Sequence, residues 1–225
     1  MTERVPIVIE AQAVSSENQG LLAAAELLSE CLGNAAGGGA WPVRLQVNAP
    51  GAKIGSSPPT VLIVSLLHEM ERLDEPIAET EARWDEALTS LLAQGTPVFL
   101  RNIFRNVPEP KRDGTHSPVL ERIRRLNRMA IGLSHRCGVG VIDIDRACAH
   151  IGGQALQADW RLGGAVAAEV AGHTTVWSLL SYGLDEVVDP DLEERAKANL
   201  GSLLQIGVLL RRRLKRQSAR QASGT

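Results

Sequence analysis

Aromatic residues are scarce in this sequence of 225 residues, of which Phe, Trp and Tyr together make up 3%. Hydrophobic residues still account for 44% of the chain, so Leu, Ile, Val and Ala must build one sizeable core. No run of about 18 apolar residues occurs, and we therefore expect no transmembrane helix. The N-terminal residues lack the basic start, apolar stretch and cleavage site of a signal peptide, so a cytoplasmic location is the expectation.

Cysteine is also rare, and Cys31, Cys137 and Cys148 show no Cys-x-x-Cys spacing. An odd number of cysteines without a secretion signal argues against a disulfide framework. The sequence has no His-Glu-x-x-His motif and no histidine cluster, so we expect no metal site. Neither a Gly-x-Gly-x-x-Gly motif after the first strand nor a Walker-type loop occurs, and we expect no cofactor.

Positive charge is concentrated near the C-terminus, although the formal net charge of the chain is −2. The segment from Arg211 to Arg220 contains several arginines and a lysine but no acidic residue. Such a segment can meet nucleic acid, anionic lipid or an acidic protein, or it can be a solvated helix end. Because the segment is short and has no interleaved aromatic residues, we favour the solvated helix end and expect no nucleic-acid binding. An acidic protein partner of this C-terminal helix is the functional alternative.

Five short apolar runs predict β-strands. Val and Ile dominate these runs, which are too short for helices. The continuous apolar run from Val61 to Val64 is typical of a strand that is buried on both faces. The predicted strands are Val5–Glu10, Val43–Val47, Thr60–Leu66, Pro97–Asn102 and Val139–Ile144.

Helical spacing of apolar residues separates these runs. Ser117 and Pro118 are a typical N-cap and first helical residue for one of the helices. The predicted helices are Glu17–Leu32, Glu75–Ala93, Pro118–Cys137, Ala165–Tyr182 and Pro190–Lys215.

Alternating strands and helices predict βαβ units and a parallel sheet with helices on both faces. We expect an α/β fold: a single-domain three-layer αβα sandwich whose five-stranded, flavodoxin-like sheet has the order 2-1-3-4-5. This domain is expected to span residues 1–190. An amphipathic basic helix over 191–217 is expected to pack on it through Leu203, Leu204, Val208 and Leu210, and a disordered tail to occupy 218–225.

In such a sheet, ligands bind beyond the carboxyl ends of the strands, where the strand order reverses. Polar residues follow the first three predicted strands: Gln12, Ser15, Ser16, Asn48, Gly51, His68 and Glu69. Each has a structural alternative. Ser15 and Ser16 can cap a helix, Gly51 can shape a turn, and His68 with Glu69 can form a capping pair. Asp145 can be the N-cap of the next turn, and His173 can be a hydrogen-bonded core histidine.

Several segments resemble the SGNH/GDSL hydrolase family over roughly Val5 to Tyr182. They are Val61–Glu69, Gly95–Phe104, Arg125–Ala130 and Gly138–Asp145, which resemble its third strand and loop, fourth strand, helix and fifth strand. The resemblance implies a flavodoxin-like sheet, a serine nucleophile, an oxyanion hole and an Asp-x-x-His pair. Members are esterases, lipases, acyltransferases and carbohydrate deacetylases.

The resemblance also implies roles for particular residues. The Gly-Asp-Ser motif falls near Glu10-Ala11-Gln12, which has no serine, so Ser15 or Ser16 becomes the candidate nucleophile. Gly51 matches the oxyanion glycine, and His68 stands where the family has asparagine. The Asp-x-x-His motif reads Asp159-Trp160-Arg161-Leu162, which leaves His173 as a candidate base. Gln12, Asn48, Gly51, His68 and Glu69 form the predicted oxyanion and binding set.

Two functions follow from these residues. The first is an SGNH-like hydrolase or acyltransferase that acts on an acyl ester of a small molecule or carbohydrate, using Ser15 or Ser16, His173 or His68, and Asp159. The alternative is a catalytically inactive SGNH-like accessory or binding protein in a biosynthetic or surface-polymer pathway. A regulatory module that docks through the basic C-terminal helix is a third class.

Overall fold

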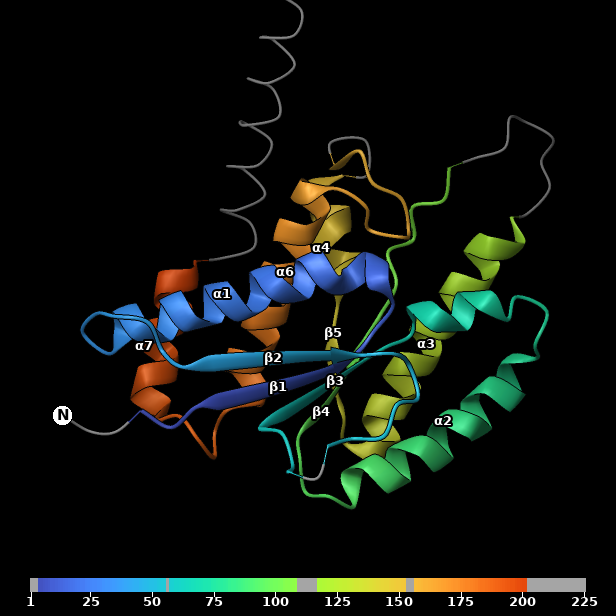
Figure 1. Ribbon diagram of the computed structural model, residues 1–225. Coiled ribbons are helices and arrows are strands. Elements are labelled where there is room, and N and C mark those ends of the chain that lie inside the picture. The colour runs from blue at the N-terminus through green and yellow to red at the C-terminus, as the bar shows by residue number, and fades with distance from the viewer. Residues whose placement is uncertain (1–3, 56, 109–116, 153–155, 202–225) are drawn as a thin grey trace, which may run out of the picture.

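Five parallel strands form one sheet in the computed structural model, which describes residues 4–55, 57–108, 117–152 and 156–201 (Figure 1). The strands are β1 (Ile7–Gln12), β2 (Val43–Asn48), β3 (Val61–Ser65), β4 (Val98–Arg101) and β5 (Gly140–Ile142). Their order is β2-β1-β3-β4-β5, and all neighbours pair in parallel. The predicted α/β class, the parallel sheet and the order 2-1-3-4-5 are confirmed.

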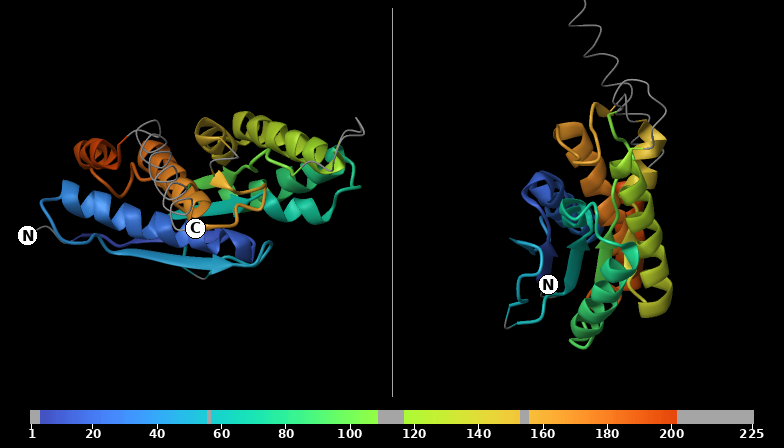
Figure 2. Two further views of the ribbon diagram at one scale, coloured as in Figure 1. Left: turned by 90° about the horizontal axis from the view of Figure 1, so that it is seen from above. Right: turned by 90° about the vertical axis from the view of Figure 1, so that its right-hand side faces the viewer.

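Helices cover both faces of this sheet and complete a flavodoxin-like three-layer sandwich (Figure 2). Helices α2 and α3 pack on one face; α1, α4, α6 and α7 pack on the other. Two short 3-10 helices, η1 and η2, follow β1 and β3. The bounds are η1 Ser15–Glu17, α1 Asn18–Ala35, η2 Leu67–Glu71, α2 Ile77–Leu92, α3 Pro118–Cys137, α4 Ile144–Ile151, α6 Ala165–Tyr182 and α7 Pro190–Leu200.

Strand burial follows position in the sheet. Every residue of the central strand β3 is buried, as its continuous apolar sequence predicts. The edge strand β2 instead alternates between half-buried and exposed residues over its first four positions. Successive side chains point to opposite faces, so Phe99 of β4 joins the core under α1 and α6 while Leu100 joins the core under α2 and α3.

Local signals define both ends of α3. The Ser117 hydroxyl accepts a hydrogen bond from the Leu120 backbone N–H, Pro118 is the first helical residue, and Gly138 ends the helix with a φ of 73°. The predicted N-cap and bounds of this helix are confirmed.

Helix α4 was not predicted, because its first residue, Ile144, belongs to the apolar run that predicts a strand. Its N-cap is Asp143, whose carboxylate accepts the Arg146 backbone N–H at 3.0 Å. The expectation that Asp145 is the N-cap is wrong, because Asp145 already lies within the helix. Its carboxylate accepts the Arg105 backbone N–H at 2.9 Å instead.

Helix α7 ends at Leu200, where Gly201 adopts φ 73° and ψ 172° and leaves the helical region. It therefore does not continue to Lys215 as one helix. Residues 202–225, which include the larger part of the basic helix predicted over 191–217 and the predicted tail, lie outside the described residues. Within the part of the chain that the structure describes, no helix combines the length and apolar character that crossing a bilayer requires.

Changing Glu193 to glutamine should stabilise the fold at alkaline pH. The Glu193 side chain is buried on α7, and its Oε1 has no hydrogen-bond partner among the described residues. Burial, and then the charge of Asp185, raise the pKa of this carboxyl from 4.5 to about 7. The folded state thus binds the proton more tightly than the unfolded state, and the resulting stability is present below pH 4.5 and is lost as pH rises through about 7.

We therefore expect the free energy of unfolding of Glu193→Gln to exceed that of the wild type by about 1–3 kcal/mol near pH 8. The gain should vanish near pH 4. Urea denaturation at both pH values measures it, with the same change at the exposed neighbour Glu194 as control. An equal effect of both substitutions would contradict the role of burial.

Candidate ligand-binding site

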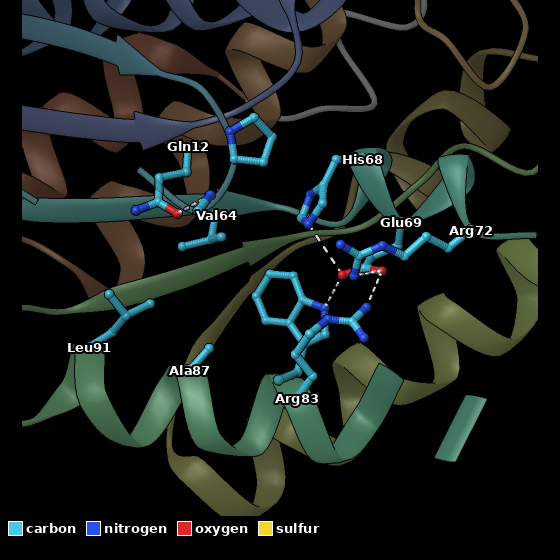
Figure 3. A pocket seen from close by; sticks show the side chains of 11 residues that line it. Gln12, Val64, His68, Glu69, Arg72, Arg83, Ala87 and Leu91 are labelled. Atoms are coloured by element: carbon cyan, nitrogen blue, oxygen red, sulfur yellow. Dashed lines mark hydrogen bonds and ion pairs between the residues drawn. The ribbon is translucent and has the colours of Figure 1, made fainter. Parts of the chain in front are cut away.

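A cavity of about 230 Å³ opens beside the carboxyl ends of β1 and β3 (Figure 3). In the sheet, β2 lies on one side of β1 and β3 lies on the other. The space beyond β1 and β3 is therefore the point where the strand order reverses. The wall combines four predicted binding residues, of which His68 and Glu69 belong to η2, with Arg72 and residues of α2. The lining residues are Gln12, Pro50, Gly51, Val64, His68, Glu69, Arg72, Arg83, Trp84, Ala87 and Leu91.

Glu69 is the electrostatic centre of this wall. Its carboxylate, 1% exposed, accepts hydrogen bonds from Arg83 Nη2 at 2.6 Å and from Trp84 Nε1 at 2.8 Å. Arg72 Nη1 lies 3.8 Å away. Burial by itself raises the pKa of this carboxyl, but the hydrogen bond and charge of His68, the Trp84 indole and the charge of Arg83 lower it to about 2. The Glu69 carboxylate is therefore ionised and already bound by several donors, and it orients its cationic neighbours.

His68 links this carboxylate to the end of β3. Its Nδ1 lies 2.8 Å from the Ser65 carbonyl oxygen, and its Nε2 lies 3.2 Å from Glu69 Oε1. Both partners are acceptors, so both contacts are hydrogen bonds only when each ring nitrogen carries a proton. No side chain of η2 caps the helix, so the capping interpretation of His68 and Glu69 is wrong.

Gln12 and Gly51 meet on the opposite wall. The Gln12 side chain donates from Nε2 to the Ala52 carbonyl at 2.9 Å and accepts the Gly51 N–H at Oε1 over 3.2 Å. Gly51 has a φ of 76°, which a glycine adopts without strain. The Gly51 N–H, which the family resemblance assigns to an oxyanion hole, is thus already bonded to Gln12.

Asn48 lies at the end of β2 and not in the cavity wall. Its Nδ2 donates to Glu10 Oε1 at 2.8 Å, and Glu10 itself is buried. This bond ties the neighbouring strands β1 and β2 together at their carboxyl ends.

Ser15 and Ser16 are exposed residues of the 3-10 helix η1. Neither hydroxyl caps a helix, since the N-cap of η1 is Val14 and that of α1 is Glu17, so the capping interpretation is wrong. Neither serine lines the cavity. The buried serine hydroxyl at this edge of the sheet is Ser65, at the end of β3.

His173 and Asp159 have separate partners. His173 is 3% exposed on α6, and its Nε2 bonds to the carbonyl oxygen of Leu200 on α7 at 3.1 Å. Burial lowers the pKa of this imidazole. Asp159 accepts the backbone N–H of Arg161 at 2.8 Å and its Nη1 at 2.6 Å. Among the described residues, no hydrogen bond or ion pair connects His173 or Asp159 with Ser15 or Ser16, and the contacts of His173 agree with the core-histidine alternative.

A buried ionic network that the sequence analysis missed underlies η1. The Ser65 hydroxyl donates to Glu17 Oε1 at 2.9 Å and accepts the Leu67 N–H at 3.0 Å. Arg101 Nη1 lies 3.4 Å from the same Glu17 oxygen, and both side chains are almost fully buried. Arginine directly after an apolar strand segment is the sequence signal for this pair.

Arg72, Arg83 and Trp84 are polar or aromatic cavity residues that the sequence analysis did not predict. Trp84 looks like an ordinary core residue of α2, and Arg83 like an ordinary surface residue. Arg83 and Trp84 reach Glu69 from 14 and 15 positions further along the chain.

The chemistry open to other candidate groups is limited. Burial raises the pKa of the Cys148 thiol to about 12, so this cysteine is not a nucleophile near neutral pH. Among the described residues, no group of three His, Cys, Asp or Glu side chains is placed to hold a metal ion.

The fold and the cavity together define a flavodoxin-like α/β protein with a candidate ligand site at the switch point of its sheet. No family model matches the chain, and no curated protein matches it. The resemblance to SGNH hydrolases therefore stays a prediction.

Proposed function

We propose that this chain is an SGNH-like binding protein that holds a small carboxylate at the switch-point cavity without serine catalysis. The observation that carries the proposal is the wall of the cavity. It presents cationic and apolar side chains, and the Gly51 N–H that an oxyanion would need is bonded to Gln12.

Arg72 is the best-placed group for an anionic head. Arg83 is already held by Glu69 and Glu75, at 2.6 Å and 2.9 Å. Arg72, in contrast, has a half-exposed side chain and only a 3.8 Å contact with Glu69. A guanidinium with free N–H groups is suited to a carboxylate, which it can bind through two parallel hydrogen bonds.

The remaining wall supports an apolar tail. Val64, Trp84, Ala87 and Leu91 supply apolar side-chain surface to the cavity wall. Pockets for drug-sized ligands enclose about 300–1,000 Å³, so this smaller cavity favours a short acyl chain.

Serine hydrolysis is less well supported by this arrangement. Catalysis needs a nucleophile within hydrogen-bond reach of a base, and that base needs a free nitrogen. Both nitrogens of His68 face acceptor oxygens, of Ser65 and Glu69, and Ser15 and Ser16 do not line the cavity.

Calorimetric titration with butyrate and hexanoate should detect binding, whereas the neutral amides of the same length should bind at least about tenfold more weakly. Arg72→Gln should raise the Kd for the carboxylates by about the same factor, because it removes the proposed charge-assisted hydrogen bonds. Arg44→Gln, at an exposed arginine of β2, is the matched control. Equal affinity for acids and amides would contradict the proposal.

A panel of aryl esters separates binding from catalysis. We expect no turnover that depends on Ser15 or Ser16. A fall of about 10³-fold or more in the rate of Ser15→Ala or Ser16→Ala would overturn the non-catalytic proposal and establish the hydrolase.

A further inference from the structure

A second and larger concavity, of about 1020 Å³, lies between α3 and α4 beyond the carboxyl ends of β4 and β5. It is separate from the switch-point cavity, with which it shares no lining residue. We call it the arginine groove, because its lining includes Arg105, Arg124, Arg125, Arg128 and Arg146.

Helix geometry places these arginines on two facing walls. Arg128 follows Arg124 by four residues and Arg125 by three, so these side chains share one exposed face of α3. Arg146 and His150, four residues apart, form the corresponding exposed face of α4. Both walls thus present long, exposed cationic or polar side chains toward the same space.

Each acidic residue of the groove already forms a hydrogen bond or an ion pair within the protein. Asp143 accepts Asn102 Nδ2 at 2.7 Å and caps α4, and Asp145 pairs with the Arg105 side chain. Glu121 pairs with Arg125 at 2.9 Å.

Three arginines of the groove have no such acidic partner among the described residues. In the described ranges no acidic side chain forms an ion pair with Arg124, Arg128 or Arg146. Five arginines against Glu121, Asp143 and Asp145 leave the lining with an excess of positive charge, on a chain whose formal net charge is −2.

We propose that the arginine groove binds an acidic polypeptide segment of a partner protein. The charge of the groove complements aspartate and glutamate side chains, and guanidinium groups bind carboxylates through paired hydrogen bonds. The rise along α3 from Arg124 to Arg128 is about 6 Å, which matches about two residues of an extended peptide. Carboxylates on alternate residues of such a peptide therefore reach both arginines.

The lining distinguishes this partner from nucleic acid. None of its residues is Phe, Tyr or Trp, so it offers no aromatic platform on which bases could stack. Ile131 and Ala149 are exposed in the groove and can contact apolar side chains of a peptide.

Fluorescence anisotropy with the 225-residue chain tests this site. The probes are a fluorescein-labelled peptide of alternating Glu and Leu and a labelled single-stranded oligonucleotide of equal length. We expect the peptide to bind at low salt, and Arg124→Glu/Arg128→Glu to raise its Kd by about tenfold or more. Arg146→Glu, on the other wall, should weaken binding in the same direction.

Arg44→Glu on β2 is the control, because it makes the same charge change at an exposed arginine outside the groove. The basic residues between Arg211 and Arg220 are present in every variant, so any binding of the peptide to them is common to all variants and a difference in Kd reports on the substituted arginines. An equal loss with Arg44→Glu, no peptide binding at low salt, or tighter binding of the oligonucleotide would each overturn the proposal. Circular dichroism and thermal melting confirm that each variant is folded.

Discussion

Replacing Arg101 by methionine should lower the free energy of unfolding by about 3–5 kcal/mol, because it leaves a charged carboxylate buried without its cation. The side chains of Arg101 and Glu17 are only 1% and 2% exposed. Methionine keeps the apolar bulk of the arginine stem and so isolates the loss of charge. Urea denaturation near neutral pH measures the effect.

A second substitution that restores stability tests the charge argument more directly. Adding Glu17→Gln to Arg101→Met should recover part of the stability, since no uncompensated charge then remains buried. Arg125→Met is the matched control, because Arg125 forms an exposed pair with Glu121 that should contribute no more than about 0.5 kcal/mol. A cost at Arg101 as small as that at Arg125 would show that the buried pair does not stabilise the fold.

Glu69→Gln should lower the free energy of unfolding by about 3 kcal/mol near neutral pH. The substitution keeps the shape of the side chain but removes the charge that Arg83 and His68 face. The same change at Glu86, an exposed residue of α2, should alter stability by no more than about 0.5 kcal/mol.

The pH dependence identifies the origin of that difference. The contacts of Glu69 lower its folded-state pKa from 4.5 to about 2, so its contribution to stability is fully present above pH 4.5 and is lost as pH falls toward about 2. The gap between wild type and Glu69→Gln should therefore close across this acid range. A gap that stays constant from neutral pH to about pH 2 would mean that the glutamine acts through packing and not through charge.

The same carboxylate connects stability to the proposed ligand site. Glu69 holds Arg83 in place and lies within reach of Arg72, the proposed partner of a carboxylate ligand. Loss of carboxylate binding in Arg72→Gln with unchanged stability would separate ligand recognition from the structural role of Glu69.

Local sequence determined where most elements lie. The cap at Ser117, the proline that follows it and Gly138 define α3, and the continuous apolar run of β3 marks a strand buried on both faces. These signals act over a few residues, so they are visible without the tertiary structure. Helix α4 was not predicted, because its first apolar residue continues the strand-like run before it.

The predicted strand order also gave the location of the cavity. An order of 2-1-3-4-5 places the loops after β1 and β3 side by side, and Gln12, Gly51, His68 and Glu69 do line one cavity there. The sequence pattern thus determined the region of the site.

Tertiary packing alone decided which groups meet. Arg83 and Trp84 reach Glu69 because α2 packs over the loop that follows β3, and His173 bonds to Leu200 because α7 folds back on α6. The arginine groove likewise arises from two helices that are apart in the sequence and adjacent in space. Periodicity shows which face of a helix is apolar, but the partner of a polar side chain depends on the packing of whole elements against one another, which no local pattern records.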